Sequence, residues 1–219
     1  MPNFLSVDNI AFTIIGYPMS YVEFIGTILY LWSVWLISKR RMLTWPVGII
    51  SVLLYMALFY QIRLYSDTLE QVYYLGMGIY GWWMWNKSPK DDGQIIDVHY
   101  SNQRVIFLWI ALTVIVAIIM GFFMTRVQTL FPVIFPAAAS FPYLDALTTI
   151  MSFSAMWLMV QKKTESWIYW IIVDTIGIWL YFVKDVKFIS MLYVILLILA
   201  INGLRMWAKV ARRANEPNY

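Results

Sequence analysis

Long apolar stretches alternate with short charged turns along most of the chain. Each stretch holds about 18 to 21 residues, enough for an α-helix to cross roughly 30 Å of hydrocarbon. The pattern therefore predicts an all-α polytopic membrane protein with seven transmembrane helices, at residues 21–38, 44–62, 68–86, 104–124, 143–161, 166–183 and 188–207.

Three segments lie outside these spans. Residues 1–20 hold one apolar piece, Ile10–Ile15, which is too short to cross a membrane and is expected at its interface. The connection 86–103 is polar and contains the only histidine, His99, for which we expect a solvated position and no role. The connection 125–142 is apolar and is expected to lie on or dip into the interface, because of its composition and its three prolines, Pro132, Pro136 and Pro142.

Composition supports the membrane class. The chain is 62% hydrophobic and 13% charged, with a mean hydropathy of +0.69, whereas soluble domains are about 45 to 50% apolar and about 25% charged. No basic residue precedes Lys39, so the start does not resemble a signal peptide and the first helix is expected to direct its own insertion. With no cysteine and one histidine, no disulfide, metal or cofactor is expected. The net charge of +4 comes from helix ends and does not indicate nucleic-acid binding.

The basic residues predict the orientation. Loops on the cytoplasmic side of a membrane are enriched in Lys and Arg. With seven spans, only Arg63, Arg126, Lys184 and Lys187 fall on one side. The other twelve fall on the opposite side, which places the C-terminus in the cytoplasm and the N-terminus outside; they are Lys39, Arg40, Arg41, Lys87, Lys90, Arg104, Lys162, Lys163, Arg205, Lys209, Arg212 and Arg213.

The chain repeats itself at an offset of 122 residues. Residues 21–87 align with 143–209 without a gap and share 16 identities. Shared tryptophans and glycines at one offset are hard to attribute to apolar composition alone, and Trp35/Trp157, Trp45/Trp167, Gly81/Gly203 and Trp85/Trp207 are among them.

The repeat predicts a parallel 3+1+3 arrangement. Two triplets joined directly would be inverted, so the single helix 104–124 restores equal orientation. Parallel repeats occur in transporters, whose substrate binds near the midplane between the halves; duplication retained for packing alone is the alternative. The predicted divisions are an external segment 1–20, a first repeat 21–86, a linker 87–142, a second repeat 143–207 and a cytoplasmic tail 208–219.

One carboxylate interrupts the sixth span. Asp174 lies in the middle of ESWIYWIIVDTIGIWLYFV, residues 165–183. A charge at the centre of a membrane helix costs about 3 kcal/mol or more, so Asp174 is expected to face a polar cavity. Trp170 and Tyr181 share its helical face and make this stripe aromatic and acidic. The alternative is a packing role, in which Asp174 only hydrogen-bonds a neighbouring helix.

Two blocks resemble a known family. WPVGIISVLLYMALFYQIRLYSDTLEQVYYLGMGIYGWWMW (45–85) and KKTESWIYWIIVDTIGIWLYFVKD (162–185) are similar to the PnuC-type bacterial nicotinamide riboside transporters, whose architecture is like that of the SWEET facilitators. The resemblance covers residues 21–209. It implies facilitated uptake of nicotinamide riboside across the bacterial inner membrane, trapping by a cytoplasmic kinase, and a homotrimer.

The chemistry of that ligand suggests which residues bind it. Aromatic faces such as Trp170 or Tyr181 can hold a flat pyridinium cation, and Asp174 can supply the opposing charge. The ribose and carboxamide need hydrogen-bonding groups, for which the candidates are Gln71, Tyr74, Tyr80 and Asn202. Tyr80 and Asn202 correspond under the 122-residue offset, which is why Asn202 is preferred.

No basic residue lies deep in a predicted span, so an unphosphorylated substrate is expected. No GxxxxGK[ST] loop is present, so transport is expected to be passive or ion-coupled. Three alternatives stay open at this stage: a transporter of another flat vitamin such as thiamine, a membrane-embedded enzyme, and a seven-helix receptor. The sequence favours a transporter over an enzyme because it lacks a metal cluster or a paired acid and base.

Overall fold

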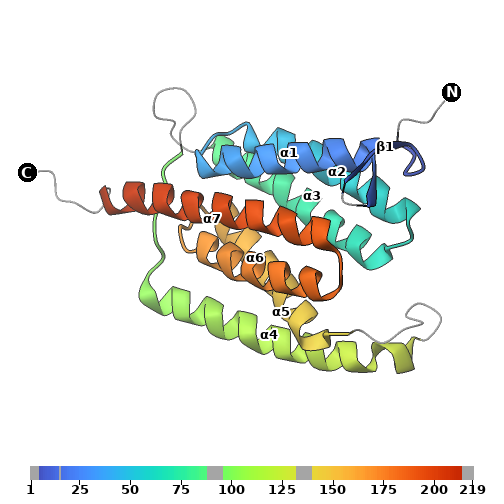
Figure 1. Ribbon diagram of the computed structural model, residues 1–219. Helices are drawn as coiled ribbons and strands as arrows, with labels where there is room; N and C mark the ends of the chain where they lie inside the picture. The colour runs from blue at the N-terminus through green and yellow to red at the C-terminus, as the bar shows by residue number, and fades with distance from the viewer. Residues whose placement is uncertain (1–4, 15, 88–95, 132–139, 214–219) are drawn as a thin grey trace, which may run out of the picture.

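The structure is a computed structural model that describes residues 5–14, 16–87, 96–131 and 140–213. Figure 1 shows helices that run roughly along one direction: α1 to α3 on one side, then α7, α6 and α5, with α4 along the opposite edge. The elements of the described residues are β1 (Ile10–Ile14), β2 (Tyr17–Ser20), α1 (Tyr21–Ser38), α2 (Thr44–Gln61), α3 (Tyr65–Asn86), α4 (Gln103–Leu130), α5 (Pro142–Val160), α6 (Ser166–Val183) and α7 (Lys187–Arg213).

The described helices lie at the seven predicted positions, with differences at some ends. Helix α4 continues to Leu130, so part of the connection expected at the interface is helical, and Pro142 is the first residue of α5. Proline fits there because its missing N–H would be unpaired in any case. Residues 132–139, with Pro132 and Pro136, lie outside the described residues. Of the seven helices in the described residues, six are long and apolar enough to cross a membrane; α3 is not among them, since its many tyrosines, tryptophans and glycines, together with Asp67 and Glu70, make it less apolar.

The described residues before α1 contain a β-hairpin, which the sequence analysis did not predict. Strands β1 and β2 form an antiparallel hairpin, which lies at the end of the bundle where α1 begins (Figure 1). Its second strand is tightly packed, because Met19 and Ser20 are buried. Ser20 also caps α1, its hydroxyl accepting a hydrogen bond from the Glu23 amide.

The first triplet, α1 to α3, and the second triplet, α5 to α7, correspond closely. Adding 122 to the bounds of α2 gives the bounds of α6, and α1 and α3 begin within one residue of the positions that match α5 and α7. The turns correspond too. Arg40 and Lys162 have positive φ (58° and 61°), as do Arg63 and Asp185 (61° and 58°). Each of the four follows a helix, where a left-handed residue closes the last turn.

Four tryptophans join the two triplets. Trp45 meets Trp85 edge to face at 5.1 Å, and Trp167 meets Trp207 in the same way at 5.6 Å. Trp85 and Trp207 lie 6.2 Å apart, centroid to centroid. Their indole nitrogens donate across the bundle, Trp85 to the Val160 carbonyl of α5 and Trp207 to the Ile37 carbonyl of α1 (2.9 and 3.1 Å). Each triplet therefore donates a hydrogen bond to a carbonyl at the end of a helix in the other triplet.

The described part of the chain between α3 and α4, residues 96–102, also packs against this cluster, although the side chain of His99 is exposed as expected. Ile96 and Val98 are buried beside the tryptophans. The His99 side chain is exposed, but its backbone pairs with the α5–α6 turn: His99 N–H donates to the Lys162 carbonyl, and Thr164 N–H donates to the His99 carbonyl. We call residues 96–101 the strap. Residues 88–95 lie outside the described part of the chain.

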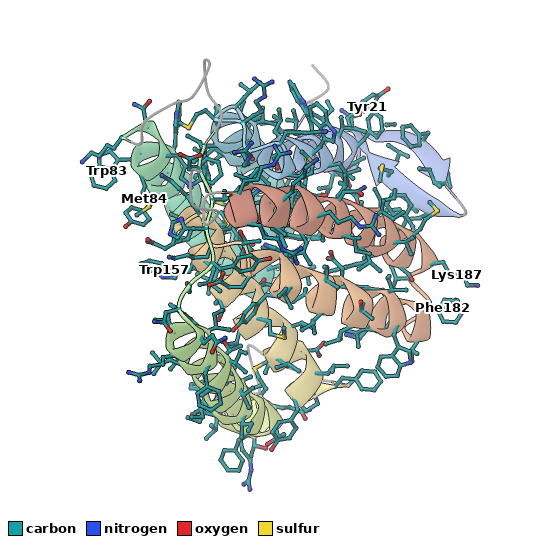
Figure 2. All side chains as sticks on the ribbon, turned by 90° about the vertical axis from the view of Figure 1, so that its left-hand side faces the viewer. Tyr21, Trp83, Met84, Trp157, Phe182 and Lys187 are labelled. Carbon is teal, nitrogen blue, oxygen red and sulfur yellow. The ribbon has the colours of Figure 1, made fainter. Side chains whose placement is uncertain are left out.

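The outer surface of the bundle is apolar. Side chains project from it on all sides in Figure 2, where Trp83 and Phe182 point away from the bundle in different directions. Helix α4 is the most exposed of the six apolar helices, since only 17% of its most apolar segment is buried, and it packs on α5. Such a surface suits lipid.

We expect the two glycines beneath the tryptophans to be intolerant of a methyl group. A Cβ at Gly203 would lie 2.6 Å from the Trp167 ring, and a Cβ at Gly81 would collide with Trp45. Gly81→Ala and Gly203→Ala should each destabilise the protein by about 1–3 kcal/mol through overpacking, lowering the thermal midpoint in detergent. Gly76→Ala is the matched control, because nothing lies within 4 Å of its Cβ position and alanine favours helix. Equal midpoints for all three variants would contradict the packing described here.

The docking of the strap should depend on pH. Partial loss of hydration on one side of the otherwise exposed ring, together with nearby Lys163 and Lys162, lowers the pKa of His99 despite opposing effects of Glu165 and Asp97. A lowered pKa means that the docked strap binds a proton less well than a free one, so docking weakens as pH falls through about 6.5. Hydrogen exchange of the Thr164 amide, corrected for its intrinsic pH dependence, should quicken on acidification, and His99→Gln should remove the effect. Exchange that slows in acid would contradict it.

Candidate functional site

Asp174 is enclosed within the bundle without a partner. It is 4% exposed, in the middle of α6. Within the described residues, no hydrogen bond or ion pair ends on its carboxylate. A buried charge is normally paired or hydrogen-bonded, because leaving it uncompensated costs several kcal/mol. The packing role considered for Asp174 required a hydrogen bond to a neighbouring helix, and the described residues provide none.

Tyrosines from two other helices lie within electrostatic range of this carboxylate, and a tyrosine of a third helix adjoins them. Asp174 acts electrostatically on Tyr30 of α1 and Tyr193 of α7. Tyr74 of α3 lies within electrostatic range of both tyrosines, Tyr30 and Tyr193. Its hydroxyl contacts the side chain of Ser152 on α5. All three tyrosines keep accessible surface even though their neighbours come from different helices. Three partly buried tyrosines from three helices are thus linked to one another, and two of them to Asp174.

A glycine allows Tyr193 to approach α6. A Cβ at Gly177 would lie 2.5 Å from the Tyr193 ring. The Tyr193 ring also stacks on Tyr181, one turn further along α6, with the two ring centroids 5.3 Å apart and the planes 19° from parallel. Towards the end of the bundle that carries the hairpin, Glu70 acts on Tyr74, Tyr181 and Tyr193. Tyr74, Tyr181 and Tyr193 thus lie between carboxylates at this end of the bundle and Asp174 deeper inside it.

The structure brings together some of the residues predicted from the sequence. Asp174, Tyr181 and Tyr74 share the surroundings just described. Trp170 lies one turn from Asp174 but is partly buried against the tryptophan cluster and against a second buried cluster that includes Ala155 and Leu158, so much of its ring serves the core. Gln71 is half-buried on α3, one turn before Tyr74.

Tyr80 and Asn202 lie elsewhere. Tyr80 stacks on Trp157 and Trp83 at 6.0 and 5.9 Å, next to α5. Asn202 is exposed on α7, on the face opposite the buried Ala200 and Trp207. The structure does not bring either residue to the Asp174 tyrosines.

Tyr30 and Tyr193 were not predicted, although the sequence carried a signal for the second. Tyr193 lies at helical spacing between the buried Ser190 and Leu196, on the face of α7 that continues through Ala200, Gly203 and Trp207. It also corresponds to Gln71 under the 122-residue offset. The helical face of α7 and the 122-residue offset together indicate Tyr193, and not Asn202, as the site residue of this helix.

A second feature of the surface is an apolar groove. It has a volume of about 310 Å³ between α3, α4 and α5, and a hydrogen bond of 2.9 Å joins Thr113 to Ser154 in its lining. Tyr73, Trp109 and Phe153 also line it. Its apolar lining, which lacks a charged group, makes it a poor site for a charged ligand.

Comparison with known proteins identifies the family. The profile of the nicotinamide mononucleotide transporter family matches residues 20–209. The chain belongs to this family. One relative, the nicotinamide riboside transporter PnuC of Escherichia coli K12, is 31% identical, and the match covers 96% of each chain.

Other members of the family differ in their named ligands. The riboflavin/roseoflavin transporter RibM of Streptomyces davaonensis is 27% identical, with 96% of this chain and 95% of that protein covered. The crystal structure of the vitamin B3 transporter PnuC superposes with a TM-score of 0.70 at 22% identity, covering 88% of this chain and 83% of the other. That likeness shows the shared fold. The family and these relatives are transporters, which agrees with the sequence-based preference for a transporter over an enzyme.

The site suits a flat, positively charged ligand. Tyrosine faces attract cations, and an enclosed carboxylate attracts them more strongly than one in water. The phenol hydroxyls can donate and accept hydrogen bonds, as a sugar or carboxamide requires.

We expect Asp174→Asn to stabilise the empty protein. The substitution keeps the shape of the side chain and removes a charge whose burial costs about 3 kcal/mol. At about 2–4 °C per kcal/mol for a chain of this size, the thermal midpoint in detergent should rise by several degrees. A fall in the midpoint would instead show that the carboxylate makes a stabilising contact.

Proposed function

We propose that this chain transports nicotinamide riboside across the bacterial inner membrane. The observation that carries the proposal is the uncompensated carboxylate of Asp174 among convergent tyrosines, because nicotinamide riboside is a flat cation attached to a sugar. The E. coli relative named for the same ligand supports it. We propose Asp174, Tyr30, Tyr74, Tyr181 and Tyr193 as the residues that surround the substrate.

For the topology, we propose seven transmembrane helices in a parallel 3+1+3 arrangement. The matching bounds of the two triplets, the paired positive-φ turns and the reciprocal tryptophan hydrogen bonds support it. Helix α3, the one helix of the described residues that is not apolar enough by itself, crosses the membrane as well and brings the number of spans to seven. Its polar residues face the other helices. The distribution of basic residues favours an external N-terminus and a cytoplasmic C-terminus, and Figure 1 places the hairpin and the end of α7 at opposite ends of the bundle. A homotrimer is the assembly that the family resemblance implies.

We further propose that the substrate lacks a phosphate, although the family is named after the mononucleotide. The charged groups that act on Tyr74, Tyr181 and Tyr193 include the acidic Glu70 and Asp174, and the basic group near these rings, Lys184 at 5.9 Å from the Tyr181 ring, is already paired with Asp145. A phosphate would be repelled there and needs basic partners. Uptake would then be passive, drawn inward by phosphorylation in the cytoplasm.

Riboflavin is the second candidate, because RibM covers nearly the same length of chain. It is also a flat vitamin, but its ring is neutral. The uncompensated charge of Asp174 therefore favours the pyridinium over the flavin.

Uptake by purified protein in proteoliposomes tests these assignments. Labelled nicotinamide riboside should enter saturably, and an excess of unlabelled riboside should compete, whereas nicotinamide mononucleotide and riboflavin should not. Asp174→Leu should weaken uptake about tenfold or more, a loss of about 1.4 kcal/mol or more. Saturable uptake of labelled riboflavin without uptake of labelled riboside would assign the chain to the second candidate, and unchanged riboside uptake by Asp174→Leu would remove the acid from the site.

A further inference from the structure

A second buried carboxylate lies near the hairpin end of the bundle. Glu23, in the first turn of α1, is 8% exposed. Its carboxylate accepts a hydrogen bond of 2.8 Å from the Tyr17 hydroxyl and another from the Ser20 amide. Both donors are neutral. No ion pair in the described residues involves Glu23, so the charge is hydrogen-bonded but not balanced.

The duplicated chain provides a natural comparison. Glu23 corresponds to Asp145 in the first turn of α5. Asp145 pairs with Lys184 at 3.4 Å, and its side chain is 31% exposed. The residue that corresponds to Lys184 in the first triplet is Ile62. Of two carboxylates at matching positions, one has a basic partner and access to water, and the other has neither.

Aromatic rings surround the unbalanced carboxylate. Tyr17 stacks on Phe188 at the start of α7, with centroids 5.4 Å apart and planes 9° from parallel. It therefore bridges α1 and α7 over this end of the bundle. Tyr55 of α2 lies within electrostatic range of Glu23, and its hydroxyl is 2.7 Å from that of Thr27. The combination of a carboxylate and tyrosine faces repeats the chemistry around Asp174.

A polar route connects the two carboxylates. Glu23, Thr27 and Tyr30 follow one face of α1 at spacings of four and three residues, and Tyr30 lies about 10 Å deeper than Glu23 at 1.5 Å per residue. Tyr55 spans the interval, because it contacts Thr27 and meets the Tyr30 ring edge to face at 6.5 Å. Tyr30 in turn lies within range of Asp174.

We propose that Glu23, with Tyr17 and Tyr55, forms an outer binding station for the cationic ring of the substrate, which the ring occupies before it reaches Asp174. The proposal rests on the proposed function, since it concerns the same positively charged substrate. Glu23 also completes a capping box with Ser20, and capping needs an acceptor oxygen but no charge. The station needs the charge, so the two roles respond differently to substitution.

Two substitutions at Glu23 separate charge from shape. Glu23→Gln keeps the length and an acceptor oxygen but removes the charge, whereas Glu23→Asp keeps the charge and shortens the side chain. With labelled nicotinamide riboside in proteoliposomes, Glu23→Gln should raise KM about tenfold, the effect of about 1.4 kcal/mol. Glu23→Asp should raise KM by less. Asp145→Asn, at the matching position that Lys184 already neutralises, should leave KM unchanged.

The opposite order overturns the proposal. If Glu23→Asp raises KM as much as Glu23→Gln or more, or if Glu23→Gln leaves KM unchanged, Glu23 is a helix cap and no station. If Asp145→Asn matches Glu23→Gln, the effect is one of general surface charge, and the station is again rejected. Failure of the wild-type protein to take up the riboside would instead reject the proposed function.

Discussion

The reciprocal hydrogen bonds of Trp85 and Trp207 are the interaction on which the rest of the structure depends. Each indole donates to a carbonyl at the end of a helix in the other triplet. These rings are fully buried and in contact, so the two triplets share one core at this end of the bundle. The strap adds Ile96 and Val98 to the same core. Motion of one triplet against the other must therefore pivot about this cluster or break it.

The duplication repeats the scaffold but not the chemistry inside it. Tryptophans, glycines and turn residues recur at the 122-residue offset, whereas the residues around the carboxylate do not. Asp174 corresponds to Val52, Tyr193 to Gln71, and Tyr30 to Ser152. A ligand with a charged ring at one end and a sugar at the other is itself asymmetric. Two equivalent frames with different linings can bind such a ligand in one orientation.

The sequence predicted the helices well because membrane spans follow from apolar length alone. It did not predict the hairpin, since a short apolar run beside Gly16 and Pro18 gives no periodic signal. It also did not predict the burial of Ile96 and Val98, because these residues lie in a polar segment and are buried only through contacts with distant turns. Asp174 was recognisable as one acid in an apolar helix. Asn202 was selected by symmetry without regard to helical face, and for the same reason Tyr193 was overlooked.

The central claim is that the cationic ring of the substrate binds beside the Asp174 carboxylate of α6. An experimental structure with nicotinamide riboside bound tests this most directly. It should show the pyridinium ring within about 6 Å of the Asp174 carboxylate, the range over which opposite charges favour each other, in contact with Tyr30 or Tyr193. A ring bound in the apolar groove between α3, α4 and α5, or with its charge turned away from Asp174, would contradict the account.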